Sequence, residues 1–433
     1  MRLDSSFQFE SYNDFYVLLF LLDKIILFLL DIYNNAMNAL IQKSLTKVKG
    51  VSVSFKRYLY HKIDWNDRLI IIKGARGVGK TTLVLQYIKE KFAYNDNALY
   101  VSLDDIWFAE NRLVNLADEF TKLGGTHLFI DEVHKYPDWS REIKNIYDDH
   151  PDLHLILTSS SALQILKGSS DLSRRSVIYS LNEMSLREYI RLHYQVELPE
   201  LSLHQILNDH PKKAAEIMDS VKPIRVFNEY LKFGSYPYSI ENKNNYLQRL
   251  LNTIILTLET DMPAILNIDY SSVVKLKRLL YVITTSSPFK PNVSELSQKI
   301  GVSRDTLLRY IHYLENAHLI NLLKTEKTGM SYMAKPDKIF PGNPNVLYAI
   351  GEEQINTGTL RETFFFNQLI SLTKLYYTPV GDFNVNNDFV VEIGGKNKTH
   401  KQIKSLRDGY LALDGMEIGY KNKIPLWLFG FLY

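Results

Sequence analysis

Residues 74–81 read Gly-Ala-Arg-Gly-Val-Gly-Lys-Thr and match the pattern G-x-x-x-x-G-K-S/T. The apolar run Arg68–Lys73 leads into this stretch, and a segment with helical periodicity leads out of it from Thr81. In such a strand–turn–helix unit, glycines let several backbone N–H groups point at one phosphate, aided by the positive end of the helix. The stretch therefore predicts a phosphate-binding loop (P-loop) on a parallel sheet.

The residues of this loop have distinct expected roles toward ATP and Mg2+, the predicted cofactors. Lys80 is expected to bridge the β- and γ-phosphates, and the Thr81 hydroxyl is expected to ligate Mg2+. The predicted nucleotide-binding residues are Gly74, Ala75, Arg76, Gly77, Val78, Gly79, Lys80, Thr81 and Thr82.

A second apolar run, Leu128–Ile130, ends in two acids, Asp131 and Glu132. Asp131 is expected to hold Mg2+ through water, and Glu132 is expected to polarise the attacking water as a general base. The alternative is a strand that simply ends in solvated acids. Loop and acid pair together predict an Mg2+-dependent ATPase.

Two further sets of candidate catalytic residues carry weaker signals. Thr158 and Ser159 follow an apolar run at the place of a γ-phosphate sensor, although serine-rich turns after strands are common. Arg174 and Arg175 precede the next run, and one of them is expected to reach a neighbouring subunit's ATP as an arginine finger or to act in cis. The alternative for the two arginines is plain surface exposure.

Short apolar runs alternate with helical patterns over the first half of the chain. This alternation predicts an α/β fold in which helices cover both faces of a parallel sheet. The expected buried strands are Arg68–Lys73, Ala98–Leu103, His127–Asp131, Leu153–Thr158 and Val177–Leu181. The expected helices are Thr81–Phe92, Asn111–Leu123, Trp139–Asp148 and Ala162–Leu166.

Length and composition set outer bounds on the protein. The chain has 433 residues, enough for about two to four domains. It is 45% hydrophobic and 23% charged, the balance of a globular protein, and its net charge of +3 neither demands nor excludes a nucleic-acid partner. The sequence has no cysteine, which excludes disulfides, zinc–thiolate sites and thiol nucleophiles and fits a cytoplasmic location.

Phe15–Tyr33 is an apolar run nearly long enough to span a bilayer, which takes about 20 residues. Asp23, Lys24 and Asp31 interrupt it, and a charge near the centre of a membrane helix costs about 2.5–3.5 kcal/mol. Three interpretations stay open: a buried or partner-docking helix, a membrane-associated helix, and a translated stretch upstream of a start at Met37. We do not predict a membrane span.

Several motifs occur in an order that resembles a known family. GARGVGKTT, FIDEVHK, ILTSSS, DLSRR and NEMSLREY (182–189) resemble the prokaryotic AAA+-type ATPases that join an ATPase core to a winged-helix segment and a C-terminal PD-(D/E)xK nuclease-like domain. The resemblance covers about residues 51–433. It implies phosphate binding, magnesium binding, catalysis and sensing by Lys80, Thr81, Asp131, Glu132 and Thr158 or Ser159.

Five segments are expected on these grounds. They are an N-terminal hydrophobic helix and linker (1–50), the P-loop core (51–181), a helical domain (182–288), a winged helix-turn-helix (289–345) and an α+β restriction-endonuclease-like domain (346–433).

The expected helix-turn-helix begins at Val293, turns at Gly301 and continues from a cap at Ser303. Residues 290–338 carry eight Lys/Arg against five Asp/Glu, a mild basic excess. Lys299, Arg304 and Arg309 are candidates for contacts of residues 291–340 with double-stranded DNA. The alternative is a structural or protein-docking module, with a homo-oligomer or another protein as partner.

The last segment has the outline of a metal-dependent nuclease but lacks one part. Glu362 is expected to open a helix, and Asp382 and Glu392 to lie on consecutive strands as Mg2+ ligands. An E-x-K motif needs lysine two residues after Glu392, where Gly394 stands, and the nearest lysine is Lys396. We therefore expect a nuclease-like fold without cleavage.

These observations favour an ATP-driven switch in which nucleotide state repositions C-terminal domains that bind DNA or a partner. Two alternatives stay open, an ATP-gated nuclease and a signalling or chaperone-like ATPase that acts on protein only.

Overall fold

The structure, a computed structural model, describes residues 24, 37–92, 95–160, 172–286, 290–326, 335–351, 355–399, 403, 406 and 408–433. The expected helix Ala162–Leu166 and, apart from Lys24, the run Phe15–Tyr33 lie outside these residues. Within the described ranges, no helix combines the length and the apolar character that crossing a bilayer requires.

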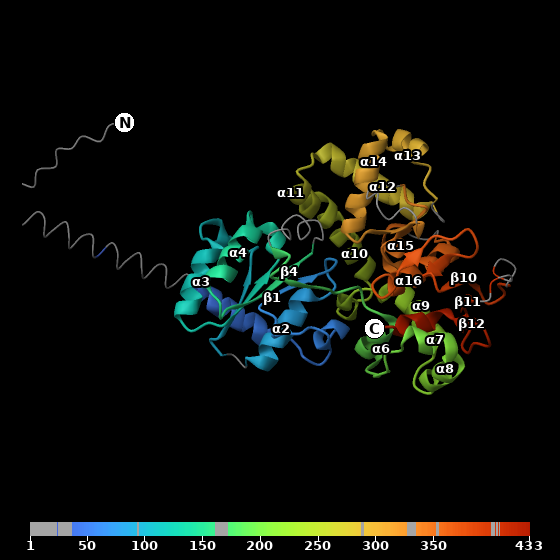
Figure 1. The fold of residues 1–433 in the computed structure, drawn as a ribbon, viewed down its shortest axis with the longest axis horizontal. Coiled ribbons are helices and arrows are strands. Elements are labelled where there is room, and N and C mark those ends of the chain that lie inside the picture. Colours follow the sequence, from blue (N-terminus) through green and yellow to red (C-terminus); the bar gives the residue numbers. More distant parts are fainter. Residues whose placement is uncertain are drawn as a thin grey trace, which may run out of the picture.

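A parallel sheet forms the first layer of the fold (Figure 1). Its strands are β1 (Leu69–Lys73), β2 (Ala98–Ser102), β3 (His127–Asp131), β4 (His154–Ser159) and β5 (Val177–Ser180). The order is β2-β3-β4-β1-β5, and every pair is parallel. The predicted parallel sheet is confirmed, and its order places β4 between the strand before the P-loop and the strand that ends in the two acids.

Helices cover both faces of this sheet, as the sequence predicts. Ile70 and Ile72 face α2 (Lys80–Lys91), whereas Leu69 and Ile71 face α3 (Leu113–Lys122) and α4 (Trp139–Asp149). The alternation follows from the two-residue side-chain period of a strand.

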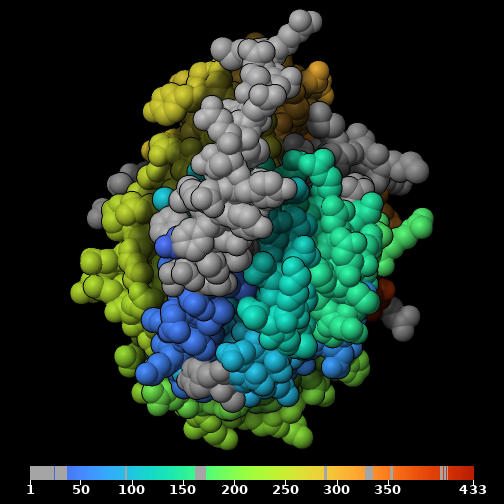
Figure 2. Space-filling model, turned by 90° about the vertical axis from the view of Figure 1, so that its left-hand side faces the viewer, coloured from blue at the N-terminus to red at the C-terminus, as the bar shows by residue number. Residues whose placement is uncertain are grey.

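Residues 37–50 are helical and join the face of the sheet that α3 and α4 cover, through Met37 and Leu40. Figure 2 looks onto this end of the molecule, where the blue segment after residue 37 lies beside the cyan and teal helices.

One expected strand differs in burial. β5 was expected to be buried, yet Val177 is 38% and Ile178 40% exposed. The expectation is wrong: β5 lies at an edge of the sheet and its side chains are not covered, whereas β2 at the other edge is buried.

Helices dominate the middle of the chain. They are α6 (Leu186–Tyr194), α7 (Leu203–Asn208), α8 (His210–Met218), α9 (Pro223–Phe233), α10 (Tyr246–Leu256), α11 (Met262–Leu266) and α12 (Tyr270–Thr285). A π-helical turn, η5 (Thr257–Asp261), joins α10 to α11. Single 3-10 turns are η1 (Tyr58–His61), η2 (Ile106–Ala109), η3 (Val133–Lys135) and η4 (Pro237–Ile240).

The expected pair of helices follows as α13 (Val293–Ile300) and α14 (Arg304–Asn316). Gly301 closes α13 at φ +75°, and the Ser303 side chain accepts a hydrogen bond from the Thr306 amide at the start of α14. Strands β6 (Ile320–Leu323) and β7 (Lys338–Pro341) then pair antiparallel. Residues 327–334 between them lie outside the described part of the chain.

The last part is a mixed sheet with helices, so an α+β region follows the core. After α15 (Pro344–Gly351) and α16 (Thr357–Leu369), the sheet has the order β12-β11-β10-β9-β8. Its strands are β8 (Leu375–Tyr376), β9 (Phe383–Val385), β10 (Phe389–Gly395), β11 (Gly409–Asp414) and β12 (Lys423–Pro425), and η7 (Leu426–Phe431) follows.

The hydrophobic cores do not follow the order of the sequence. Helices α6 to α9 share a core with α16, η7 and the C-terminal sheet, and they lie beside β10–β12 in Figure 1. Helices α10, α12 and α14 instead share a core with α2 and one face of the parallel sheet. The segment 182–288, expected as one helical domain, thus contributes to two cores.

Phe227 tests this shared core, because its ring packs 4.7 Å from Phe364 of α16 and is fully buried. Phe227→Ala is expected to lower the free energy of unfolding by about 3–5 kcal/mol through the lost burial and the cavity left behind. Urea denaturation followed by fluorescence measures this. Tyr270→Ala, at a side chain that is 75% exposed, is the control, and an equal loss there would contradict the assignment.

Candidate nucleotide site

The P-loop takes a backbone shape that only its glycines favour. Gly77 has φ +87° and Gly79 has φ +99°, values that L side chains rarely adopt. A Cβ atom on Gly77 would also lie 2.9 Å from the ring of Tyr238 in η4. The loop is thus held against the helical region as well as against the sheet.

Lys80 opens α2 and is buried at 4% exposure. Its Nζ donates hydrogen bonds to the carbonyl oxygens of Gly74 at 2.9 Å and Ala75 at 3.0 Å. Burial lowers the pKa of Lys80, while Glu132 and Asp131 act in the opposite direction. The ammonium group therefore lies inside the loop, where phosphates would replace these two carbonyls as its partners.

Three hydroxyl groups donate hydrogen bonds to the Asp131 carboxylate at the carboxyl end of β3. Thr81 Oγ1 donates to Asp131 Oδ2 at 2.7 Å, and the Tyr100 hydroxyl donates to the same atom at 2.8 Å. Thr158 Oγ1 donates to the other carboxylate oxygen. A hydroxyl and a carboxylate side by side are hard oxygen donors of the kind Mg2+ prefers, so Thr81 and Asp131 fit the predicted metal.

Glu132 lies next to this cluster in a constrained position. Its φ of +57° is unusual for a residue other than glycine, and its amide donates to Thr158 Oγ1 at 3.2 Å. Burial raises the pKa of Glu132, opposed by Lys80. The structure therefore brings Glu132 together with the sensor candidate Thr158.

The second sensor candidate, Ser159, is fully buried at the end of β4, and its Oγ lies 3.5 Å from His134 Nδ1. His134 Nε2 in turn lies 3.2 Å from Glu132 Oε2 and 2.9 Å from Ser160 Oγ. Sequence reasoning missed His134 and Ser160 as members of the site. The only sequence signal for these two residues was their position just after β3 and β4, two strands whose carboxyl ends lie beside the P-loop.

Of the two arginine candidates, Arg175 pairs away from the P-loop, and Arg174 is exposed. Arg175 precedes β5 and donates to both carboxylate oxygens of Asp148, at 2.9 and 3.0 Å, near the amino ends of the strands. The P-loop lies at the carboxyl end of the neighbouring strand β1, so this contact holds Arg175 away from the P-loop of its own chain. The action on a neighbouring subunit stays a prediction.

Arg76, within the P-loop, has a partner that the sequence did not reveal. Its Nη1 lies 3.0 Å from Asp261 Oδ2, and Asp261 is 6% exposed at the end of the π-helical turn η5. The loop that would hold phosphates is thus ion-paired directly to the helical region.

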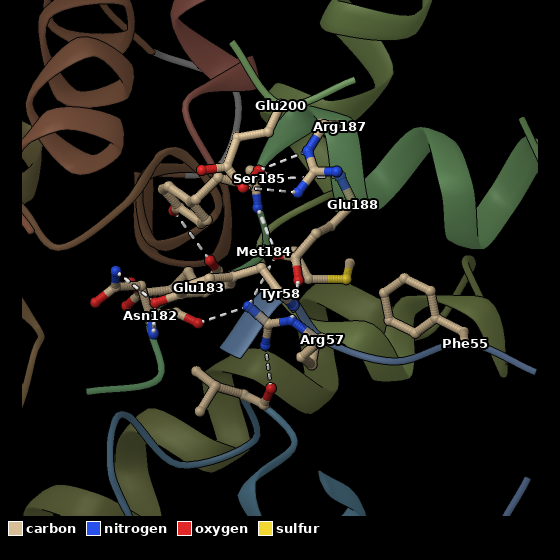
Figure 3. A network of polar contacts seen from close by, with 12 residues as sticks. Phe55, Arg57, Tyr58, Asn182, Glu183, Met184, Ser185, Arg187, Glu188 and Glu200 are labelled. Atoms are coloured by element: carbon tan, nitrogen blue, oxygen red, sulfur yellow. Dashed lines mark hydrogen bonds and ion pairs between the residues drawn. The ribbon is translucent and has the colours of Figure 1, made fainter. Parts of the chain in front are cut away.

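A second buried network clamps the other side of the loop (Figure 3). Arg57 Nε donates to Glu188 Oε1 at 2.9 Å, Arg57 Nη2 donates to the carbonyl of Asn182 at 2.7 Å, and Arg57 Nη1 donates to the carbonyl of Val78 in the P-loop. Both side chains of the ion pair are 4% exposed. Ser185, which caps α6, also donates to the main-chain oxygen of Tyr433 at 2.6 Å. Arg57 thus links the loop to α6 and, through α6, to the C-terminal region.

The acidic residues of the C-terminal region pair with lysines. Lys338 of β7 lies 3.2 Å from Glu362 Oε2 and 3.3 Å from Asp382 Oδ1, and Lys398 lies 2.9 Å from Glu392 Oε1. Burial raises the pKa of Glu362, and Asp382 acts in the same direction. In the described ranges, no three Asp, Glu, His or Cys side chains come together as a metal-binding group.

Two expectations for this region need correction. Glu362 does not open its helix, because α16 begins at Thr357, after a cap at Asn356. Asp382 was expected on a strand, but β9 begins one residue later, at Phe383. Lys398, and not Lys396, pairs with Glu392. A Cβ atom on Gly394 would lie 2.6 Å from the Lys398 Cβ and Cγ atoms, so Lys398 fills the space that a side chain at 394 would take.

Comparison with known proteins agrees with the geometry of the core. Residues 66–190 match a family described as an AAA domain, and residues 224–350 match a domain of unknown function (DUF8612). The sheet order, the P-loop after β1 and this match define the core as an AAA-type P-loop α/β fold.

The chain is similar to two uncharacterized proteins of Methanocaldococcus jannaschii. It is 26% identical to MJ1637 over 397 residues, which cover 83% of this chain and 82% of the relative. It is 23% identical to MJ1544 over 362 residues, which cover 78% and 74%.

Likenesses to solved structures are weak. AMPPCP-bound DnaA from Aquifex aeolicus is 16% identical at a TM-score of 0.24, with 59% of this chain and 84% of that chain covered. NtrX from Brucella abortus in complex with ADP is 15% identical at a TM-score of 0.29, with 67% and 76% covered.

The Arg57–Glu188 pair gives a stability prediction. Arg57→Met leaves a buried carboxylate without its counter-charge and is expected to cost about 3–5 kcal/mol in the free energy of unfolding. The double variant Arg57→Met/Glu188→Met removes both charges and is expected to recover most of this loss. Chemical denaturation of both variants measures the difference, and equal losses would show that the charge pair is not the cause.

Proposed function

We propose that the protein is an ATP-binding and ATP-hydrolysing switch whose nucleotide state is transmitted to its C-terminal regions. The observation that carries the proposal is the 2.7 Å contact between Thr81 Oγ1 and Asp131 Oδ2 beside Lys80, which assembles phosphate and Mg2+ ligands in one place. In this proposal Glu132 is the general base, and Thr158 and Ser159 sense the γ-phosphate. Mg2+ would neutralise charge that develops on the phosphates.

Two sets of contacts support transmission of the nucleotide state from the P-loop core to the helices that follow it. Arg76 joins the P-loop to η5, and α10 and α12 next to it share a core with α14. Helix α12 also packs against α13 and α14 directly. A phosphate that competes for Arg76 would therefore act on helices continuous with the helix-turn-helix.

For the output we propose that residues 291–340 form a winged helix that binds double-stranded DNA. Arg304 and Arg309 are exposed on α14, and β6 with β7 follow in the place of a wing. Cytoplasmic location and assembly with further copies or a protein partner stay part of the proposal. A signalling ATPase that acts on protein only is the alternative if DNA has no effect.

Steady-state ATP hydrolysis with Mg2+ tests the proposal on wild type and Glu132→Gln, with and without double-stranded DNA. We expect turnover by wild type, stimulated by DNA, and a loss of about 100-fold or more in the variant, since general bases contribute about 10²–10⁴-fold. ATP binding by Glu132→Gln should persist, and Lys80→Ala, which loses the phosphate contact, is the control for binding.

Three results would each argue against a part of the proposal. A wild type that binds ATP without turnover under all conditions contradicts hydrolysis. Equal turnover in wild type and Glu132→Gln contradicts the base assignment. Turnover that DNA leaves unchanged, together with no salt-sensitive DNA binding, favours the protein-only alternative.

One observation favours a second candidate, the ATP-gated nuclease. A nuclease of this type needs a lysine beside its second acid, and Gly394 stands at the motif position of that lysine. In the structure, Lys398 lies beside Glu392 instead. Against it, Lys338 bridges Glu362 and Asp382 as an internal cation where a metal would be needed. We therefore expect binding without cleavage.

Plasmid nicking with Mg2+ or Mn2+ tests this second candidate. We expect no metal-dependent nicking by wild type, because the Lys338 ammonium neutralises the two carboxylates that a metal would need. Nicking that is lost in both Asp382→Asn and Lys398→Met, with Lys396→Met as a matched control, would establish the nuclease instead.

A further inference from the structure

His318 directly follows Ala317, the C-cap of α14, and has an unusual backbone conformation. Its φ is +60°, which residues other than glycine adopt uncommonly. A Cβ atom on Gly342, just after β7, would lie 2.1 Å from the His318 carbonyl oxygen. The segment after β7 therefore packs directly against this turn and holds His318 in its strained conformation.

The side chain of His318 contains a buried nitrogen atom that lacks a partner. Its Nε2 atom is buried and makes no hydrogen bond to any residue that the structure describes. A buried polar atom without a partner is costly, and so is a left-handed backbone conformation at a residue with a side chain. Strain of this kind clusters at sites that bind a ligand, so the ring is a candidate for such a role.

Two lysines of the nucleotide site act on the His318 ring. Burial lowers the pKa of His318, against the effect of Glu183 and Glu315. Lys73, which directly precedes the P-loop, and Lys80 lower this pKa as well. Since a charge acts on a pKa mainly at short range, the ring lies near the P-loop. The imidazole is neutral near pH 7 and has one N–H group to donate.

A cavity between the core and the helical region extends from the P-loop to the end of α14. Ala317 lines it together with Arg76 of the P-loop and Ser160, which follows β4. The other lining residues come from η5 and α11. The helix-turn-helix therefore reaches the nucleotide site directly, and not only through α10 and α12.

We propose that His318 is a nucleotide-binding residue, whose Nε2–H group donates a hydrogen bond to a phosphate held by Lys80. A phosphate oxygen accepts hydrogen bonds, so a bound phosphate is the kind of partner that Nε2 lacks among the described residues. The inference deepens the proposed ATP-binding switch and rests on it. It adds a direct contact between the nucleotide and the end of α14.

Calorimetric titration of the full-length chain with ATP and Mg2+ tests the inference in His318→Asn. Asparagine tolerates a positive φ but is too short to replace the ring, so the affinity for ATP should fall about tenfold or more through the lost hydrogen bond to a charged group. The nucleotide-free variant should unfold within about 3 °C of wild type, because the lost nitrogen had no partner in the protein.

Two further variants separate the contact from a structural role. His318→Gln has an amide N–H group that can reach further than that of asparagine, and it should recover most of the affinity. His312→Asn, on the same helix, is the matched control, because the His312 ring lies 3.2 Å from Glu315 Oε2. This control should bind ATP as wild type does.

Hydrogen exchange of the wild-type chain gives a test that needs no variant. ATP should slow amide exchange at residues 314–320, because the contact holds the end of α14 to the bound nucleotide. Neither measurement needs turnover. A wild type that binds ATP without hydrolysing it contradicts the proposed ATPase activity and leaves both tests of His318 valid.

Wild-type affinity for ATP in His318→Asn overturns the inference. It is also overturned if the loss of affinity accompanies an equally large loss in His312→Asn, or a fall in the unfolding temperature well beyond 3 °C, since both would show a structural role. If His318→Asn does not fold, unchanged exchange at residues 314–320 of ATP-bound wild type overturns the inference, and slower exchange supports it.

Discussion

The guanidinium group of Arg57 is buried where the P-loop, α6 and the C-terminal region meet. It pairs with Glu188 and donates to main-chain carbonyls on both sides, at Val78 and Asn182. A charge with so little exposure is tolerated only when every N–H has a partner, and removal of one partner is far more costly than the pair itself is stabilising. Arg57 therefore fixes the P-loop against α6 and the C-terminal region.

The chain has two hydrophobic cores next to this ion pair, and each of them combines segments that are far apart in the sequence. Helices α6 to α9 pack with the C-terminal sheet, and α10, α12 and α14 pack with the nucleotide-binding core. The P-loop is therefore fastened to both, through Arg57 to the first and through Arg76 and Asp261 to the second. In the proposed switch, a change of charge in the P-loop on nucleotide binding would act on both of these contacts.

The acidic residues of the nucleotide site and those of the C-terminal region have different kinds of partner. At the nucleotide site, hydroxyl groups donate to Asp131, and His134 and Ser160 lie next to the Oε2 atom of Glu132. In the C-terminal region, lysines neutralise Glu362, Asp382 and Glu392 inside the protein. The first arrangement fits the proposed ATP hydrolysis, whereas in the second the carboxylates are already paired with lysines of the chain.

The sequence by itself determined the features that local pattern encodes. The P-loop, four of the five buried strands, the acids at the end of β3 and the turn at Gly301 between α13 and α14 follow from glycine placement, side-chain period and capping residues within a few positions of one another. Each of these rests on backbone geometry that a short segment imposes on itself. The burial of β5 was misjudged because the burial of an edge strand depends on the elements that cover it: β5 is exposed, whereas β2 at the other edge is buried.

Only the tertiary structure decided which distant side chains meet. Arg57 and Glu188 are 131 residues apart, and nothing in either local segment marks them as partners. Lys398 rather than Lys396 reaches Glu392 because the chain turns back over Gly394 and leaves the space open. His134 joins the site because the αL turn at Glu132 brings η3 back toward β4. In each case many residues of the same type were available, and the packing of elements in three dimensions selected one.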